Sequence, residues 1–189
     1  MNWLQKCSKT VLVAASALVI VGLVAGCATS TKQANTEVPK KIVIGLDDNF
    51  PPMGFKDEKG EIVGFDIDLA KAVAQKLGSE VEFKPINWDS KILDLNGGNI
   101  DLIWNGLTIT EERKKETEMT KPYFTSHQLI VVKAGSSINT KADLAGKNIG
   151  SQTESSGEEA VKKSGDDKKF KEFKTYAQYD QAFMDLDAG

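Results

Sequence analysis

Short apolar runs alternate with segments of helical periodicity along most of the chain. Residues 42–46 form an apolar, β-branched run typical of a strand, and residues 65–77 carry apolar side chains at helical spacing before the stop signal Gly78. Strands that alternate with helices predict a mostly parallel sheet covered on both faces. The other elements expected before residue 134 are two short strands joined by a turn over residues 55–63, strands over 80–86 and 100–104, and a helix over 90–95.

The same alternation starts again after residue 133. Ser155 and Ser156, each followed three residues later by a glutamate, favour the start of a helix. We therefore expect two α/β lobes, the first over residues 41–133 and the second over residues 134–189. The second is expected to contain strands over residues 147–151 and 170–173, a helix from 155 and a helix over 177–186. Because the pattern requires another strand after the last helix, we expect this lobe to be truncated.

The first 26 residues are typical of a secretory signal peptide. Lys6 and Lys9 precede an apolar run over residues 10–24, which is short for a membrane span. The run ends in Val-Ala-Gly-Cys, which resembles the lipobox of bacterial lipoproteins, in which the cysteine, here Cys27, receives the lipid. Residues 27–40 are mostly polar and predict a flexible tether between a lipid anchor on the outer face of the cell membrane and a globular body. The alternative is an uncleaved N-terminal anchor helix.

Composition and charge narrow the chemistry that the body can perform. The formal net charge is −3, and nothing in its pattern is typical of nucleic-acid binding. Cleavage before Cys27 would remove Cys7, so the body would keep no thiol for a disulfide, a metal site or a nucleophile. The single histidine, His127, falls in a strand-like segment over residues 126–132, where a structural role is more common than metal binding. We therefore expect neither a metal nor a cofactor.

The most specific chemical signal lies in residues 105–113, which follow a predicted strand. Thr110 is expected to cap a helix whose first turn contains Arg113. A carboxylate at such a helix start would meet unpaired backbone N–H groups and a guanidinium together. The alternative is that Arg113 pairs with Glu112 or Glu116 on a solvated helix face.

Five motifs together resemble the polar amino-acid family of solute-binding proteins, the extracytoplasmic receptors of ABC importers. They are residues 45–52 (GLDDNFPP), 64–70 (GFDIDLA), 99–103 (NIDLI), 108–113 (TITEER) and 121–124 (KPYF). The resemblance implies the type 2 periplasmic-binding-protein fold, in which two α/β lobes close on a ligand between them. It also implies a monomer without enzymatic activity that delivers a free, polar L-amino acid to an ABC permease.

The same resemblance implies roles for ten residues. Arg113 would bind the ligand's α-carboxylate beside Thr108, and Asp47 would help to hold its ammonium. The other candidates are the aromatic walls Phe50 and Trp88, the contacts of Asn105 and Gly106, and the second-lobe residues Gln152, Ser155 and Ser156. A planar guanidinium opposite a carboxylate suits a molecule that carries an anion and a cation a fixed distance apart. The structural alternatives are a core role for Phe50, packing of Trp88 under its helix, and a turn cap at Asp47.

Two other functions on the same fold stay open. One is an enzyme, either a dehydratase of cyclic dienyl acids or a protein with a lytic transglycosylase domain, but the sequence offers no His, Cys or Ser constellation for catalysis. The other is the sensing domain of a transmembrane kinase, against which the lipobox argues. The family's second-lobe acid for the ligand's amino group is expected after residue 189.

Overall fold

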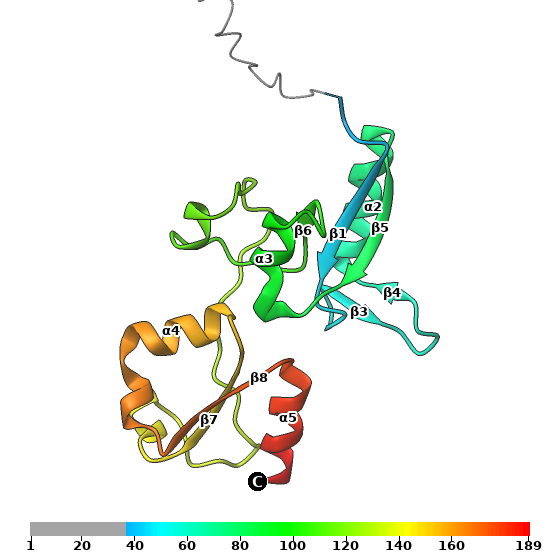
Figure 1. Cartoon of the computed structure of the whole chain (residues 1–189). Coiled ribbons are helices and arrows are strands. Elements are labelled where there is room, and N and C mark those ends of the chain that lie inside the picture. The colour runs from blue at the N-terminus through cyan, green and yellow to red at the C-terminus, as the bar shows by residue number, and fades with distance from the viewer. Residues whose placement is uncertain (1–36) are drawn as a thin grey trace, which may run out of the picture. The chain divides into compact units, whose positions relative to one another are not determined.

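The computed structural model describes residues 37–189 of the chain (Figure 1). The predicted signal peptide, the predicted lipidation site Cys27 and most of the predicted tether lie outside the described residues. Residues 37–40 are exposed and lead directly into the first strand. Within the described part of the chain, no helix has the length and apolar character needed to cross a bilayer.

The first sheet is parallel, as predicted. Its central strand β1 (Lys41–Leu46) lies between β5 (Glu80–Pro85) and β6 (Leu102–Ile103), and both neighbours run parallel to it (Figure 1). β1 pairs with β5 over its whole length but with β6 over two residues only. The central position of β1 explains why the apolar run at residues 42–46 gave a clear strand signal.

A small core joins this sheet to α2 (Phe65–Leu77). Ile42 and Ile44, two residues apart and therefore on one face of β1, pack with Ala70 of the helix. Partly buried side chains complete the cluster: Val81, Phe83 and Trp104. The helix has the predicted bounds and ends at Gly78, whose φ of 71° is the left-handed conformation typical of a helix C-terminus.

The first half of the chain also contains three short strands and a short helix. β2 (Asn49–Phe50), β3 (Gly54–Lys56) and β4 (Ile62–Val63) form a second, antiparallel sheet. The turn predicted within residues 55–63 joins β3 to β4 and is confirmed. A 3-10 turn at Trp88–Ser90 leads into α3 (Lys91–Asn96).

The second half contains a parallel strand pair and two helices, as predicted. β7 (Asn148–Gln152) pairs with β8 (Glu172–Tyr176), and α4 (Ser156–Ser164) connects them. The last helix is α5 (Tyr179–Ala188). The boundary proposed at residue 134 stays a prediction.

Several predicted elements differ in the structure. The strand expected over residues 100–104 is reduced to β6, and Leu102 is 41% exposed, because this strand pairs with β1 alone. Residues 126–132 form no strand, since no other segment within the described range pairs with them. The strand predicted over residues 170–173 begins later, at Glu172.

The predicted helix at Arg113 is also wrong: Arg113–Lys115 is a 3-10 turn of three residues. The N-cap residue of this turn is Glu112, which forms no side-chain cap bond, so the cap predicted at Thr110 is also wrong. Thr110 Oγ1 nevertheless accepts from the Arg113 N–H at 3.3 Å.

Two aliphatic residues test the position of this core. Ile44 is 1% exposed, whereas Leu93 is 74% exposed. We expect Ile44→Ala to lower the free energy of unfolding by about 2–5 kcal/mol through lost burial and the remaining cavity. The matched variant Leu93→Ala should stay within about 0.5 kcal/mol. Urea unfolding followed by circular dichroism measures the free energy of unfolding of both variants. Equal losses in the two variants would contradict the assignment of Ile44, and not Leu93, to the core.

Candidate ligand-binding site

All ten predicted site residues line one large cleft of the described chain. They come from both predicted lobes: the segment that follows β1 and includes β2, the 3-10 turn after β5, the segment after β6, the end of β7 and the start of α4. The residues are Asp47, Phe50, Trp88, Asn105, Gly106, Thr108, Arg113, Gln152, Ser155 and Ser156.

Arg113 is a buried cation held by backbone carbonyls. It is 8% exposed, Nη1 donates to the Thr108 carbonyl at 2.8 Å, and Nη2 donates to the Glu154 carbonyl at 3.0 Å. Burial lowers the pKa of Arg113 from its ordinary value, and Glu159 and Glu154 nearby act in the opposite direction. Among residues 37–189 no carboxylate forms an ion pair with this guanidinium. A pairing with Glu112 is therefore not formed; that residue pairs with Lys163 at 3.1 Å.

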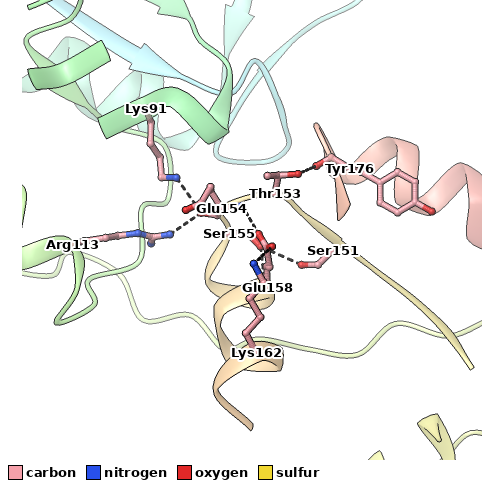
Figure 2. Close-up of polar contacts among 9 residues, drawn as sticks. All are labelled: Lys91, Arg113, Ser151, Thr153, Glu154, Ser155, Glu158, Lys162 and Tyr176. Atoms are coloured by element: carbon pink, nitrogen blue, oxygen red, sulfur yellow. Dashed lines mark hydrogen bonds and ion pairs between the residues drawn. The ribbon is translucent and has the colours of Figure 1, made fainter. Parts of the chain in front are cut away.

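Lys91 brings a second buried cation to the same carbonyl. It is 3% exposed, and its Nζ donates to the Glu154 carbonyl at 3.0 Å and to the Trp88 carbonyl at 2.9 Å. Burial, with the charge of Arg113 nearby, lowers the pKa of Lys91 to about 8. Figure 2 shows both cationic side chains pointing at Glu154. A carbonyl oxygen has two lone pairs, so one backbone group satisfies a donor from each cation.

Glu154 is held at both ends of its backbone. Its φ of 55° is unusual for a residue other than glycine. Its N–H donates to Glu158 Oε2 at 2.5 Å, while its carbonyl accepts from Lys91 and Arg113 (Figure 2). Glu158 is buried and also pairs with Lys162 at 2.5 Å. These charged contacts fix the loop that leads into α4, where they outweigh the conformational strain.

Asp47 lies at a second polar cluster in the cleft. It is 3% exposed, and Oδ2 accepts from Gln152 Nε2 at 2.6 Å. Oδ1 accepts from the Asn49 N–H at 3.0 Å and from Gln178 Nε2 at 3.5 Å. The contact to Asn49 is the turn cap that the structural alternative proposed, while the amide contacts come from residues more than 100 positions away.

Hydroxyl groups surround the start of α4. Thr108 Oγ1 and Ser156 Oγ lie 3.0 Å apart, and Gln128 Nε2 donates to the same serine oxygen at 2.9 Å. Ser155 caps the helix as predicted, since its Oγ accepts from the Glu158 N–H at 3.1 Å. Neutral hydrogen-bonding groups therefore stand beside the buried cations.

Aromatic rings contribute apolar surface to the cleft. The rings of Phe50 and Tyr179 lie 6.0 Å apart between centroids. Trp88 is 9% exposed, and Lys91 Nζ lies 5.0 Å from its ring centroid. Phe50 also lies against Gly106, where an added Cβ would come within 3.3 Å of the phenylalanine ring.

The side chain of Asn105 is buried beside Gly54. It is 2% exposed, and its Nδ2 is buried without a hydrogen-bond partner among the described residues. The same nitrogen lies 2.5 Å from the position that a Cβ on Gly54 would take. The side-chain contact expected from Asn105 stays a prediction, as does the contact expected from its backbone.

Sequence reasoning missed Lys91, Gln128, Gln178 and Tyr179. Lys91 falls in the predicted helix 90–95, where a lysine usually lies on the solvated face. Its burial depends on the loop at Glu154, 63 positions away. No local pattern signals such a pairing. Within residues 37–189 no group of three or more His, Cys, Asp and Glu side chains is placed to hold a metal.

The sequence model of the bacterial extracellular solute-binding proteins, family 3, matches residues 42–186. The chain belongs to this family. Its type 2 periplasmic-binding-protein fold is shared with a solved ancestral arginine-binding protein bound to arginine, at 47% identity and a TM-score of 0.76, over 80% of this chain and 67% of that one. An ABC uptake transporter substrate binding protein from Streptococcus pneumoniae with bound histidine is 40% identical with a TM-score of 0.77, over 79% of this chain and 62% of that one.

A curated relative agrees with these structures. The arginine-binding extracellular protein ArtP of Bacillus subtilis is 36% identical over 79% of this chain. The chain spans 61% of the length of ArtP, so it covers part of the fold of its relatives. These three proteins are named as binding proteins and not as enzymes.

The pKa of Lys91 predicts how stability depends on pH. The native state releases the Lys91 proton near pH 8, but the unfolded chain keeps it up to about 10.5. Because the unfolded state binds more protons in this window, the contribution of Lys91 to the free energy of unfolding rises as the pH rises across it.

Urea unfolding at several pH values between about 7.5 and about 10 measures this contribution as the difference between the unmodified protein and Lys91→Met. We expect the free energy of unfolding of the unmodified protein to increase, relative to that of Lys91→Met, as the pH increases. Lys76→Met, at an exposed residue of α2, is the control. A difference that is constant over the window would contradict the burial of a charged Lys91.

Proposed function

We propose that this chain forms the ligand-binding part of an extracytoplasmic receptor that binds a free L-amino acid and delivers it to an ABC importer. The observation that carries the proposal is the buried Arg113 guanidinium, for which the described residues provide carbonyl partners but no ion pair. An unpaired buried charge is costly, and an incoming carboxylate would compensate it.

The carboxylate end of the site is built around Arg113. A guanidinium carries five N–H donors, and backbone carbonyls take one from each Nη. The remaining donors have no partner among residues 37–189 and would bind the α-carboxylate, with the hydroxyl groups of Thr108 and Ser156 beside them. Ser155 caps a helix whose positive end adds to the attraction.

The ammonium end is assigned to Asp47. Its carboxylate accepts hydrogen bonds from Gln152 and Gln178, and a carboxylate has about four acceptor positions. An ammonium can therefore be held there together with the amides. Phe50 and Trp88 would exclude water on the flanks, which strengthens the charged contacts.

The energies of these contacts suit a receptor. Hydrogen bonds to charged groups contribute about 1.5–3 kcal/mol each. Three or four of them would give an affinity of about 1 μM, which is about 8 kcal/mol, after the entropy of ordering is subtracted. Micromolar binding allows both capture and release.

The names of the relatives support an amino acid as the ligand. Two of them bind arginine and one contains histidine. For this chain we propose the class, a free L-amino acid with a polar side chain, without choosing among its members. A binding function rather than catalysis is also part of the proposal.

The N-terminal assignments belong to the same proposal. Residues 1–26 act as a lipoprotein signal peptide, Cys27 carries the lipid, and residues 27–40 tether a monomeric body to the outer face of the membrane. The lobes divide at residue 134. Mass spectrometry of the protein from its native membrane would detect the lipid on Cys27.

Replacement of Arg113 tests the carboxylate end. A panel of the common L-amino acids is first screened by the shift in melting temperature of the full-length protein. For those that bind, we expect Arg113→Ala to weaken affinity by at least about 100-fold, or about 2.7 kcal/mol, through the loss of charged hydrogen bonds. Isothermal titration calorimetry measures the change.

Two further variants separate charge from geometry. Arg113→Lys keeps the charge but loses the fork, and should weaken affinity by about 10-fold or more. Lys114→Ala removes the adjacent, exposed cation and should leave affinity unchanged. A protein that responds to none of the amino acids, or that turns over a cyclic dienyl acid, would overturn the proposed function.

A further inference from the structure

Asp66 is a fully buried carboxylate without an assigned role. It is 0% exposed and lies in the first turn of α2, behind the cleft and not on its lining. Oδ2 accepts from the Gly106 N–H at 2.7 Å, and Oδ1 accepts from the Tyr123 hydroxyl at 2.8 Å. No lysine or arginine within the described residues forms an ion pair with it.

The bond to Gly106 fixes the direction of a peptide group. In a trans peptide the N–H and the preceding C=O point in opposite directions. Because the Gly106 N–H points at Asp66, the Asn105 carbonyl points away from Asp66, toward the cleft that both residues line. No donor among the described residues is bonded to this carbonyl.

Glycine adopts the backbone conformation at position 106 without the strain that a side chain would add. Its φ is 58°, and an added Cβ would also lie 3.3 Å from the Phe50 ring. The backbone therefore has the freedom to adopt more than one conformation, and Asp66 selects one. A short hydrogen bond to a buried carboxylate is strong enough to hold it.

We propose that Asp66 is a positioning residue of the binding site: it holds the Asn105–Gly106 peptide so that the Asn105 carbonyl accepts a hydrogen bond from an N–H donor of the bound amino acid. The negative charge behind the peptide also polarises it and strengthens the carbonyl as an acceptor. This inference rests on the proposed function, since it assigns one more contact of the same ligand.

The buried position of Asp66 disfavours its ionised form. Burial raises the pKa of Asp66, although the hydrogen bonds from Tyr123 and Gly106 act in the opposite direction. Because this pKa is higher in the native state than in the unfolded state, the free energy of unfolding decreases as the pH rises through it.

Asp66→Asn is the decisive variant. The asparagine oxygen can still accept from Gly106, but a neutral amide oxygen forms a weaker hydrogen bond than a carboxylate and holds the peptide less firmly. Its NH₂ can donate to the Tyr123 hydroxyl, so the packing is kept while the charge that fixes the peptide is removed. We expect the melting temperature to be equal to or above that of the unmodified protein, while affinity for L-arginine, L-histidine or L-glutamine, whichever binds, falls by about 10-fold or more.

Two controls separate positioning from packing. Tyr123→Phe removes the other hydrogen bond to the same carboxylate and should change affinity by less than about 3-fold. Asp68→Asn removes an exposed carboxylate from the same turn of α2 and should change neither quantity. Unchanged affinity in Asp66→Asn, or a loss that only parallels a lower melting temperature, would overturn the inference.

The Gly106 amide gives a readout that needs no ligand. In the unmodified protein its N–H resonance should be shifted downfield by the short bond to the carboxylate, and Asp66→Asn should reverse part of this shift. If no amino acid binds the unmodified protein, the proposed function fails. A Gly106 resonance that is insensitive to Asp66 would overturn the inference alone.

Discussion

The buried charge of Arg113 is the constraint on which the site depends. This guanidinium is buried on a 3-10 turn of three residues, where it donates to the carbonyls of Thr108 and Glu154. Neutral carbonyls stabilise a cation less than a carboxylate does. The structure therefore contains a buried positive charge without an ion pair among the described residues, and a second cation, Lys91, donates to the same Glu154 carbonyl.

Backbone groups form many of the hydrogen bonds around this charge. The Glu154 carbonyl receives both cations, and the Glu154 N–H is held by Glu158. In the first half of the chain, Asp66 holds the Gly106 N–H. In each case a buried charged side chain fixes one peptide group at a positive φ, at residues 154 and 106. Peptides held in this way keep their orientation when a ligand arrives, so less ordering is required on binding.

The sequence predicted the parts that depend on local chemistry. Periodicity and capping residues predicted the bounds of α2, the cap at Ser155 and the parallel pairing of the first sheet. The length of β6, the absence of a strand at residues 126–132 and the burial of Lys91 depend on partners distant in the chain. The family resemblance gave the ten site residues, and all line one cleft, but it did not indicate that Asn105 Nδ2 is buried without a hydrogen-bond partner among the described residues.

The central claim is that Arg113 binds the α-carboxylate of a free amino acid. The most direct test compares, in the full-length protein, the affinity for the best-binding L-amino acid with that for its α-carboxamide, which keeps the side chain and the ammonium but carries no anion. The account predicts a loss of at least about 100-fold for the carboxamide, because the charge-assisted contacts disappear. Equal affinity for the two compounds would contradict it.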